Sequence, residues 1–574
     1  MPVMPLRAVA RVAVSLLLFA VSALAQPQPA PLTADILFTH ARVLDGSGKA
    51  AIDADVAIRG DRIVFVGNAQ RSRVLAQQTY DLHGLYLAPG FIDLHTHTAG
   101  NLSDPKRHEN LNYLLQGVTT VVTGNDGNSP WPIQATLERW EHDGIGTNAA
   151  VFVGFGTVRR QAIRVADAGQ PASSEDRAPT PAELTREEEL VRQGMREGAI
   201  GISTGLFYVP QSFSKTDEVV AVSRAAAELG GLYDSHLRDE DSYNIGVRSA
   251  VAEAIEIGRQ DHMPIMISHI KCLGPEAWGC SKDVIAAVER ARAEGIKVVA
   301  NQYPYDASGT ALEAAVMPNW AMEGGRQRFL ARLADSAQRR RMLDDIPRLI
   351  AKRGGAGTLV IVGFAPGRAE RDLAEDMPAG SPSGPDVTRD MVFGKSLQQI
   401  ADAWKIPPNE AVLRILQSGS TSVVSHNMNE RDIAAFMRQD WVATGSDGSA
   451  GHPRFYGTFA RKLEKYVVAD KVISLPFAVR AATSLPAQIA GFAERGAIRP
   501  GYYADIVVFD LAKVHAAATF TSPEEFSQGF VHVLVNGQFA VKSGEPTHAL
   551  AGRVLRGPAF GKQLSATSQP SPGP

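Results

Sequence analysis

Short apolar runs alternate with longer amphipathic segments over most of the chain between residues 89 and 448. The amphipathic segments at 216–230 and 281–295 repeat their apolar positions at helical spacing and end at a glycine, which is typical of surface helices. The apolar runs predict eight buried strands, at 91–97, 118–124, 148–156, 199–205, 231–238, 264–271, 297–305 and 442–448. Because strands that alternate with helices form parallel sheets, and eight of them close a ring, the pattern predicts an α/β fold with a (β/α)8 TIM barrel.

Two further apolar runs, at 358–364 and 421–427, do not fit this series of strands. We assign them to a long excursion between the seventh and eighth strands, which contains a lid or insertion at about 321–420. The Pro- and Gly-rich stretch 365–387 within the excursion predicts a loop or lid.

Both ends of the chain show a different pattern, in which short β-prone pieces are separated by turn residues. One such region spans 34–88, and the other spans 486–556 and contains the hairpin signal Asn536-Gly537. We expect these regions to fold together as one small β-sandwich domain, with the barrel occupying 89–485. Residues 557–574 end in a Ser- and Pro-rich stretch and predict a disordered tail.

Residues 1–25 have the pattern of a secretory signal peptide. Arg7 and Arg11 precede an apolar run, and the small residues Ala23 and Ala25 favour cleavage after Ala25. A membrane anchor is the alternative, but the run is short for a bilayer span and no later stretch reaches about 20 apolar residues. We therefore expect a periplasmic or secreted protein that has no stable membrane span after cleavage.

Charge and cysteine content narrow the class of partner. The 574 residues include 58 basic and 61 acidic side chains, and the net charge of −3 gives no electrostatic footprint for nucleic acid or an anionic membrane surface. A small-molecule or peptide-like substrate is favoured, and the oligomeric state is left open. The two cysteines, Cys272 and Cys280, exclude a disulfide scaffold; in an oxidising compartment they form either one bridge or two buried thiols.

Polar side chains gather at the carboxyl ends of the predicted strands, where TIM barrels place their active sites. His95 and His97 end the first strand, and they project in the same direction because alternate residues of a strand share a face. The other strand ends supply Asp126, His236, His269 and Asp447. Any one of these histidines has a structural explanation, but together they form a set of nitrogen and oxygen donors that suits Zn²⁺ or a similar divalent ion.

Several longer motifs resemble the amidohydrolase superfamily and, more closely, the N-acyl-D-amino-acid deacylases, also called D-aminoacylases. The motifs are PGFIDLHTH, STGLFYVP, SHLRDE, SHIK, NQYPYDASGT, GSDG, HPRFYGTFARKLEKYV and GYYADIVVFD, and the resemblance covers residues 34–545. It implies a zinc-dependent barrel with a split β domain that hydrolyses the N-acyl amide of a D-configured amino acid.

The resemblance also implies roles for individual residues. It assigns His95 and His97 to one metal position and His236 with His269 to another, for one or two ions per chain. It matches Asp447 to the general acid/base that carries a proton from water to the leaving amine.

Five further residues are candidate substrate contacts. Arg454 matches the family arginine that holds the substrate carboxylate, a role for which a planar guanidinium is suited. Tyr303, Tyr305 and Ser308 match family positions that line the pocket or donate to a reacting oxygen, although the aromatic rings fit equally well as packing against the barrel rim. Lys271 lies two residues after His269 and on the same strand face, where it either contacts substrate or neutralises a nearby carboxylate.

Two features depart from the family pattern. Relatives often place a cysteine at the end of the second strand, where this chain has Asp126, and they are generally treated as cytoplasmic, whereas this chain carries an export signal. A bridging Asp126 carboxylate would bind zinc less selectively than a thiolate and admit Mn²⁺ or Co²⁺; the alternative is that it only orients a histidine. The competing functions are another enzyme of the superfamily, such as a dipeptidase or cyclic-amide hydrolase, and an exported binding protein without catalysis.

Overall fold

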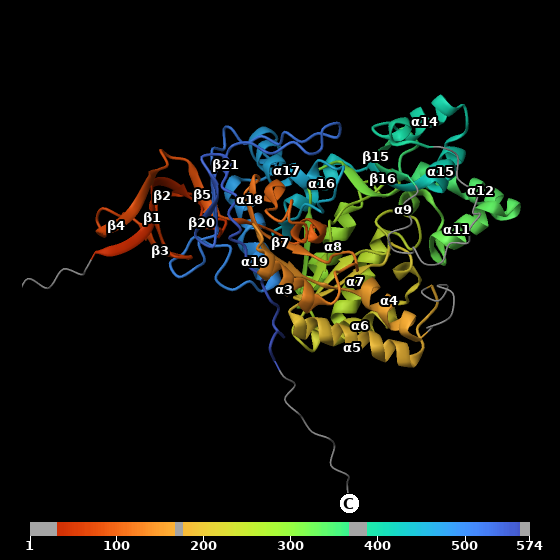
Figure 1. Ribbon diagram of the computed structural model, residues 1–574, viewed down its shortest axis with the longest axis horizontal. Coiled ribbons are helices and arrows are strands. Elements are labelled where there is room, and N and C mark those ends of the chain that lie inside the picture. The colour runs from red at the N-terminus through yellow and green to blue at the C-terminus, as the bar shows by residue number, and fades with distance from the viewer. Residues whose placement is uncertain (1–30, 167–175, 367–386, 563–574) are drawn as a thin grey trace, which may run out of the picture.

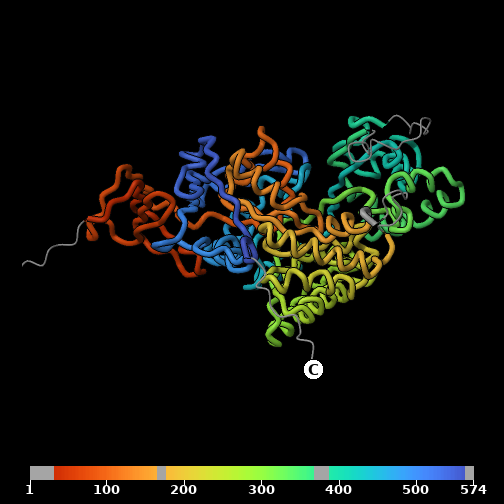
Figure 2. Tube along the Cα trace, turned by 60° about the horizontal axis from the view of Figure 1, so that its bottom comes forward, coloured from red at the N-terminus to blue at the C-terminus, as the bar shows by residue number. Residues whose placement is uncertain are grey.

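The computed structural model describes residues 31–166, 176–366 and 387–562. The predicted signal peptide, most of the stretch 365–387 and residues 563–574 of the predicted tail lie outside the described residues. Among the described residues, no helix is both long enough and apolar enough to cross a bilayer. The small β domain lies at one end of the molecule, the barrel in the middle and the insertion at the other end (Figure 1, Figure 2).

Parallel strands form the barrel, with one strand at each of the predicted positions. They are β6 (Phe91–Asp93), β7 (Val118–Thr123), β8 (Asn148–Val151) with its continuation β9 (Val153–Gly154), β10 (Gly201–Gly205), β11 (Leu232–His236), β12 (Ile265–Ile267), β13 (Val298–Gln302) and β17 (Val442–Thr444). Neighbours pair in this order, and a parallel bridge between Thr96 and Gly448 joins the last strand back to the first. The predicted (β/α)8 barrel is therefore confirmed.

Amphipathic helices cover the outside of the barrel. They include α3 (Ile133–Asp143), α5 (Pro181–Glu197), α6 (Thr216–Ala227), α7 (Val247–Asp261), α8 (Ser281–Ala293) and α18 (Leu475–Ala482), of which α6 and α8 are the two helices singled out from the sequence. Inside the barrel, Ile92, Val122 and Met266 form a buried cluster with Ala487 of α19 (Ser484–Ala490). Because apolar groups cover the strands on both faces, each strand reads as a nearly continuous apolar run.

The barrel takes up more of the C-terminal sequence than predicted. Residues 486–490, which the sequence pattern assigned to the β domain, belong to α19. Residues 549–562 run along the barrel, where the N–H of Leu555 donates to the carbonyl of Ala149 at 2.8 Å and Ala559 is buried. Apolar burial against the barrel holds this segment, and its turn-rich local sequence does not reveal that contact. The first residues of the predicted tail, from 557, are thus packed.

The small β domain contains strands from both ends of the chain in one hydrogen-bonded sheet. Its strands are β1 (Leu32–Val43), β2 (Ile52–Arg59), β3 (Arg62–Gly67), β4 (Val74–Asp81), β5 (Tyr86–Pro89), β18 (Ile506–Phe509), β19 (Phe530–Val535), β20 (Gln538–Lys542) and β21 (Glu545–Pro546). The order is β21-β20-β19-β18-β5-β1-β2-β3, with β4 on β1, and the antiparallel β5–β18 pair joins the two ends of the chain.

This sheet curls over on itself around an apolar core. The rings of Phe38 in β1 and Phe539 in β20 lie 6.3 Å apart, although four strand spacings separate β1 from β20 and would amount to about 19 Å in a flat sheet. The buried cluster between the two layers includes Phe38, Val56, Ile506 and Leu534. The chain ends therefore form the small β domain expected beside the barrel.

The insertion between β13 and β17 has its own sheet and its own apolar cluster. Its strands β14 (Ala307–Ala311), β15 (Leu359–Pro366) and β16 (Gly419–His426) pair antiparallel in the order β14-β16-β15, and the last two contain the apolar runs left over from the barrel series. Its helices are α9 (Leu312–Val316), α10 (Asn319–Met322), α11 (Gly325–Ala334), α12 (Ser336–Lys352), α13 (Arg389–Val392), α14 (Leu397–Trp404) and α15 (Pro408–Ser418). The insertion thus begins at β14, earlier than residue 321, and it reaches back to the barrel mouth.

Cys272 and Cys280 are joined by a disulfide, with their Cα atoms 6.0 Å apart. The bridge closes the loop between β12 and α8, directly after the sixth barrel strand. Of the two states that the sequence allows, the structure contains the bridge.

Candidate active site

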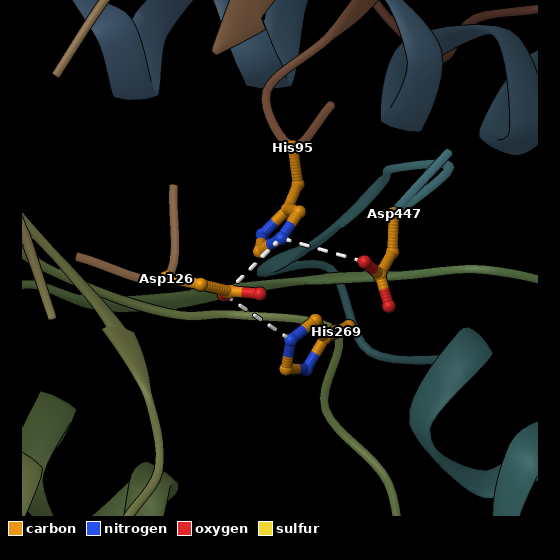
Figure 3. Close-up of side chains that lie close together, drawn as sticks. All are labelled: His95, Asp126, His269 and Asp447. Carbon is orange, nitrogen blue, oxygen red and sulfur yellow. Dashed lines mark ion pairs between the residues drawn. The ribbon is translucent and has the colours of Figure 1, made fainter. Parts of the chain in front are cut away.

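The strand-end residues singled out from the sequence converge at the carboxyl ends of the barrel strands. Asp126 Oδ1 lies 3.4 Å from His95 Nε2 and 3.6 Å from His269 Nε2, and Asp447 Oδ1 lies 3.6 Å from His95 Nε2. These four side chains come from four different strands and point toward one another (Figure 3). Their ligand atoms all lie within 4.8 Å of one another, which is close enough to hold one metal ion.

His97 and His236 complete the ring of donors around Asp126. His97 Nε2 lies 3.1 Å from Asp447 Oδ1 and 3.5 Å from Asp126 Oδ2. On the other side, His236 Nδ1 lies 3.4 Å from Asp126 Oδ1 and 2.9 Å from His269 Nε2. The Asp126 carboxylate therefore faces all four histidines, with one oxygen toward His97 and the other toward the remaining three.

The backbone at Asp126 is held in a conformation that few residues adopt. Its φ is +56°, in the left-handed region, and Gly127 follows at +73°. Asp447 and His269 also have positive φ, at 49° and 33°. Aspartate tolerates this region better than most residues, and such local strain persists where surrounding structure over-determines it, commonly at functional sites.

Several buried nitrogen and oxygen atoms of this centre have no hydrogen-bond partner in the described part of the chain. They are both ring nitrogens of His95, Nε2 of His236 and Oδ1 of Asp126. Leaving such atoms unpaired in a buried site is costly, and imidazole nitrogens and carboxylate oxygens are the ligands that zinc and similar ions take. The residues present therefore fit a divalent metal ion.

Two buried carboxyl groups that the sequence pattern does not single out hold the strand ends that carry the histidines. Asp93 accepts the N–H groups of His95 and Ser446, each at 3.1 Å, and so ties the first and eighth strand ends together. Asp234 accepts from Asn125 Nδ2 at 2.8 Å. Burial raises the pKa of Asp93 and of Asp234 to about 7. Each precedes a histidine by two residues on the same strand face, and that spacing is the signal that could have found them.

Lys271 is fully engaged with its neighbours. Its ammonium lies 2.5 Å from Glu240 Oε1, 2.7 Å from His269 Nδ1 and 3.0 Å from the His269 carbonyl. Glu240 Oε1 and the His269 carbonyl oxygen accept two of the three ammonium protons, while the direction of the contact at His269 Nδ1 depends on the tautomer of that ring. Lys271 thus neutralises a buried carboxylate, which is one of the two roles left open by the sequence, and it also lines the small chamber described below.

Glu240 is a third acidic residue of this centre that the sequence pattern does not single out. It follows His236 by four residues, and its Oε1 lies 3.1 Å from His269 Nδ1. Burial by itself raises the pKa of Glu240, but Lys271 and the nearby histidines outweigh it and hold the pKa well below its usual range. The anionic Glu240 thus faces the outer nitrogen of His269, while Nε2 of that ring faces Asp126.

Asp447 is paired with Arg454, the first residue of α17 (Arg454–Arg461). Arg454 Nη1 lies 2.7 Å from Asp447 Oδ2, and both side chains are buried. Burial by itself raises the pKa of Asp447, but the charges of Arg454 and His269 outweigh it and hold the pKa well below its usual range. The guanidinium also stacks 4.7 Å from the centre of the Tyr303 ring, which fixes its orientation.

A cavity of about 400 Å³ opens beside the centre. Its lining includes His97, Asp126, Tyr208, Asp447, Arg454 and, from β16, Val424. A second, much smaller chamber of about 20 Å³ adjoins it and is lined by Lys271, Tyr303 and Ser308 among others. Tyr305 lines neither space, and its Oη donates to the carbonyl of Pro453 at 3.3 Å. Of the predicted substrate contacts, Tyr305 is therefore the one that packs at the barrel rim.

Comparison with known proteins identifies the family. The model of the amidohydrolase family matches residues 78–346 and 417–541, which include the barrel strands, all of the strand-end ligands and, in the β domain, β5 and β18 to β20. The chain belongs to the amidohydrolase family. A D-aminoacylase from Alcaligenes xylosoxydans xylosoxydans is 32% identical over 548 residues, covering 91% of this chain and 97% of that protein. An N-acyl-D-glutamate deacylase from the same organism is 30% identical over 547 residues, covering 91% and 96%.

A solved structure extends the likeness to three dimensions. The N-acyl-D-glutamate deacylase of Bordetella bronchiseptica, crystallised with zinc and a phosphonate mimic of the tetrahedral intermediate, superposes with a TM-score of 0.72. It is 29% identical, and the match covers 91% of this chain and 100% of that one. The resemblance to D-aminoacylases stated from the motifs is thus confirmed for sequence and fold.

Proposed function

We propose that this protein is a metal-dependent hydrolase that cleaves the N-acyl amide of N-acyl-D-amino acids. The observation that carries the proposal is the Asp126 carboxylate, which faces four histidines beside an Asp447–Arg454 pair. One cavity thus combines a metal-binding centre, a carboxylate that can carry a proton, and an arginine that can bind the carboxylate of a substrate. The full-length likeness to D-aminoacylases supports the same reaction.

The metal ligands in this proposal are His95, His97, Asp126, His236 and His269. Zinc bound by such ligands lowers the pKa of water and polarises a carbonyl group. Asp126 faces both histidine pairs, so its carboxylate would serve as a ligand to an ion held by either pair. Lys271 and Glu240 hold His269 with Nε2 toward the centre, so the ring does not have to reorient when an ion binds.

Asp447 is the proton carrier. Its Oδ1 faces His97 and His95, and an attacking water at this position donates its proton to that oxygen. The water oxygen bonds to the amide carbon, the C–N bond breaks, and Asp447 passes the proton to the departing amine. Arg454 keeps the carboxylate ionised between turnovers and presents its remaining edge to the α-carboxylate of the substrate.

A substrate panel tests the reaction class. N-Acetyl-D-methionine, a dipeptide, a hydantoin and a lactone are supplied to the same zinc-loaded preparation, and product formation is followed by chromatography. We expect hydrolysis of the N-acetyl-D-amino acid at a kcat/KM at least about 100-fold above the others. A preference for the dipeptide or the hydantoin would replace the deacylase assignment with another activity of the superfamily.

We also propose that the protein is exported. The basic and apolar pattern of residues 1–25 and the Cys272–Cys280 bridge support this location. Mass spectrometry of unreduced protein from the periplasm or medium is expected to show a mature chain starting at Gln26 and a cross-linked peptide containing both cysteines. An intact N-terminus on protein found only in the cytoplasm would contradict the proposal.

A further inference from the structure

Arg353 carries a buried positive charge that faces the active site. It follows α12 at the point where the insertion returns to the barrel mouth, and it is 2% exposed. In the described part of the chain, no carboxylate oxygen lies within 4.0 Å of its guanidinium. Its Nε has no hydrogen-bond partner, and its Nη1 reaches only the hydroxyl of Ser308, at 3.4 Å.

The other two cations that line the active-site cavities are already paired. Lys271 contacts Glu240, and Arg454 contacts Asp447. The Arg353 guanidinium instead lies against aromatic rings, 5.2 Å from the centre of Tyr243. A buried charge without a counter-charge carries a large desolvation cost, so this position favours an anion supplied from outside the chain.

The space next to Arg353 is connected to the reaction centre. Arg353, Ser308 and Tyr303 line the chamber of about 20 Å³ together with His236, Glu240 and His269, and it has room for about one water-sized group, such as one carboxylate oxygen. The chamber shares Tyr208, Gly309, Thr310 and Asp447 with the larger cavity that contains Arg454. A ligand in the larger cavity can therefore extend one short polar branch toward Arg353.

We propose that Arg353 binds a second carboxylate of the substrate, in addition to the one held by Arg454. A guanidinium with a free edge beside a serine hydroxyl is suited to a carboxylate. The inference rests on the proposed function and names the substrate class: N-acyl-D-amino acids with two carboxylates. The second carboxylate belongs either to an acidic side chain, as in N-acetyl-D-glutamate, or to the acyl group, as in N-succinyl-D-methionine, and the experiment separates these sources.

Three substrates and three variants test this inference. N-Acetyl-D-glutamate, N-succinyl-D-methionine and N-acetyl-D-methionine are assayed with the wild type, Arg353→Met and Arg353→Lys. The control is Arg348→Met, which alters an exposed arginine of α12, the helix that Arg353 follows. We expect Arg353→Met to lower kcat/KM about 100-fold for one of the dicarboxylates and less than about 3-fold for N-acetyl-D-methionine. Arg353→Lys, which keeps the charge but not the planar fork, should give an intermediate loss, and Arg348→Met none.

The pattern of losses identifies the source of the second carboxylate. A selective loss for N-acetyl-D-glutamate places it on the side chain, and a selective loss for N-succinyl-D-methionine places it on the acyl group. Equal losses for all three substrates, or no loss for any, would overturn the inference.

Stability and binding provide readouts that do not need turnover. Removal of an unpaired buried charge should leave the melting temperature of Arg353→Met equal to or above that of the wild type. Calorimetry with the same three compounds should show tighter binding of a dicarboxylate that is lost in Arg353→Met. If the wild type binds them in this way but hydrolyses none, the proposed reaction fails and the Arg353 inference stands; equal binding of all three compounds contradicts the inference itself.

Discussion

Arg454 Nη1 lies 2.7 Å from Oδ2 of Asp447 and leaves the other carboxylate oxygen facing the metal-binding histidines. The guanidinium therefore pairs with Oδ2 and stabilises the negative charge, while Oδ1 is free to exchange a proton. This division makes Asp447 a carboxylate that stays ionised in a buried site. It also makes the role of Asp447 separable from metal binding by mutation.

Asp447→Asn should retain the fold but lose most turnover. The amide has nearly the same shape and can still accept a hydrogen bond, but it cannot take a proton from water and pass it to the amine. We expect kcat to fall about 10²- to 10⁴-fold while the metal content stays within error of the wild type. Steady-state kinetics on metal-analysed protein checks both, and near-normal turnover would remove Asp447 from the mechanism.

Asp126→Ala should lose metal as well as activity. Because the carboxylate faces all four histidines, we expect the wild type to bind about two equivalents of ion and the alanine variant to lose at least one. Asp126→Cys is the matched control, because a thiolate restores a ligand and should favour zinc over Mn²⁺ or Co²⁺. Metal analysis after dialysis reports the outcome. One tightly bound ion in both the wild type and Asp126→Ala would limit Asp126 to orienting a histidine.

Lys462 makes the stability of the fold dependent on pH. Its Nζ is buried and donates to Thr444 Oγ1 at 2.8 Å, and burial lowers its pKa from 10.5 to about 7. The unfolded chain therefore binds the proton more readily, and this lysine makes the free energy of unfolding rise as pH increases from about 7 to 10.5, by about 1.4 kcal/mol per pH unit.

The variant Lys462→Met removes this contribution. Denaturant unfolding between pH 7 and 10 should show the variant more stable than the wild type near pH 7, with the difference shrinking as pH rises. A constant difference across this range would mean that Lys462 does not titrate in it.

The sequence predicted the barrel and most of its ligands because both depend on local periodicity. β6 ends at Asp93, but the chain stays extended through the Thr96–Gly448 bridge, so alternation still puts His95 and His97 on one face, and parallel barrel strands all end at the same mouth. After β13, by contrast, alternation no longer governs the side chains. β13 ends at Gln302, so the ring of Tyr303 reaches Arg454 while Tyr305 packs at the rim.

Asp93 and Asp234 could have been found from their spacing along the chain, whereas Glu240 and Arg353 lie where tertiary contacts determine the path of the chain. Glu240 is in a loop after β11 that is folded by Asp239, whose Oδ2 accepts the N–H groups of Asn244 and Gly246 at 2.6 and 3.0 Å. Arg353 reaches the site from the insertion, whose packing against the barrel mouth no local pattern encodes. The boundary of the barrel near 486 was misplaced for the same reason, because α19 is held by burial in the barrel interior.

The most direct test of the account is a stereopaired hydrolysis assay on metal-analysed protein. N-Acetyl-D-methionine and N-acetyl-L-methionine are assayed with the protein as purified, after chelation and dialysis, and after zinc is restored. The account predicts hydrolysis of the D-enantiomer at least about 100-fold faster than that of the L-enantiomer, loss of this activity on chelation and its return with zinc. Equal or faster hydrolysis of the L-enantiomer, or full activity in metal-free protein, would contradict it.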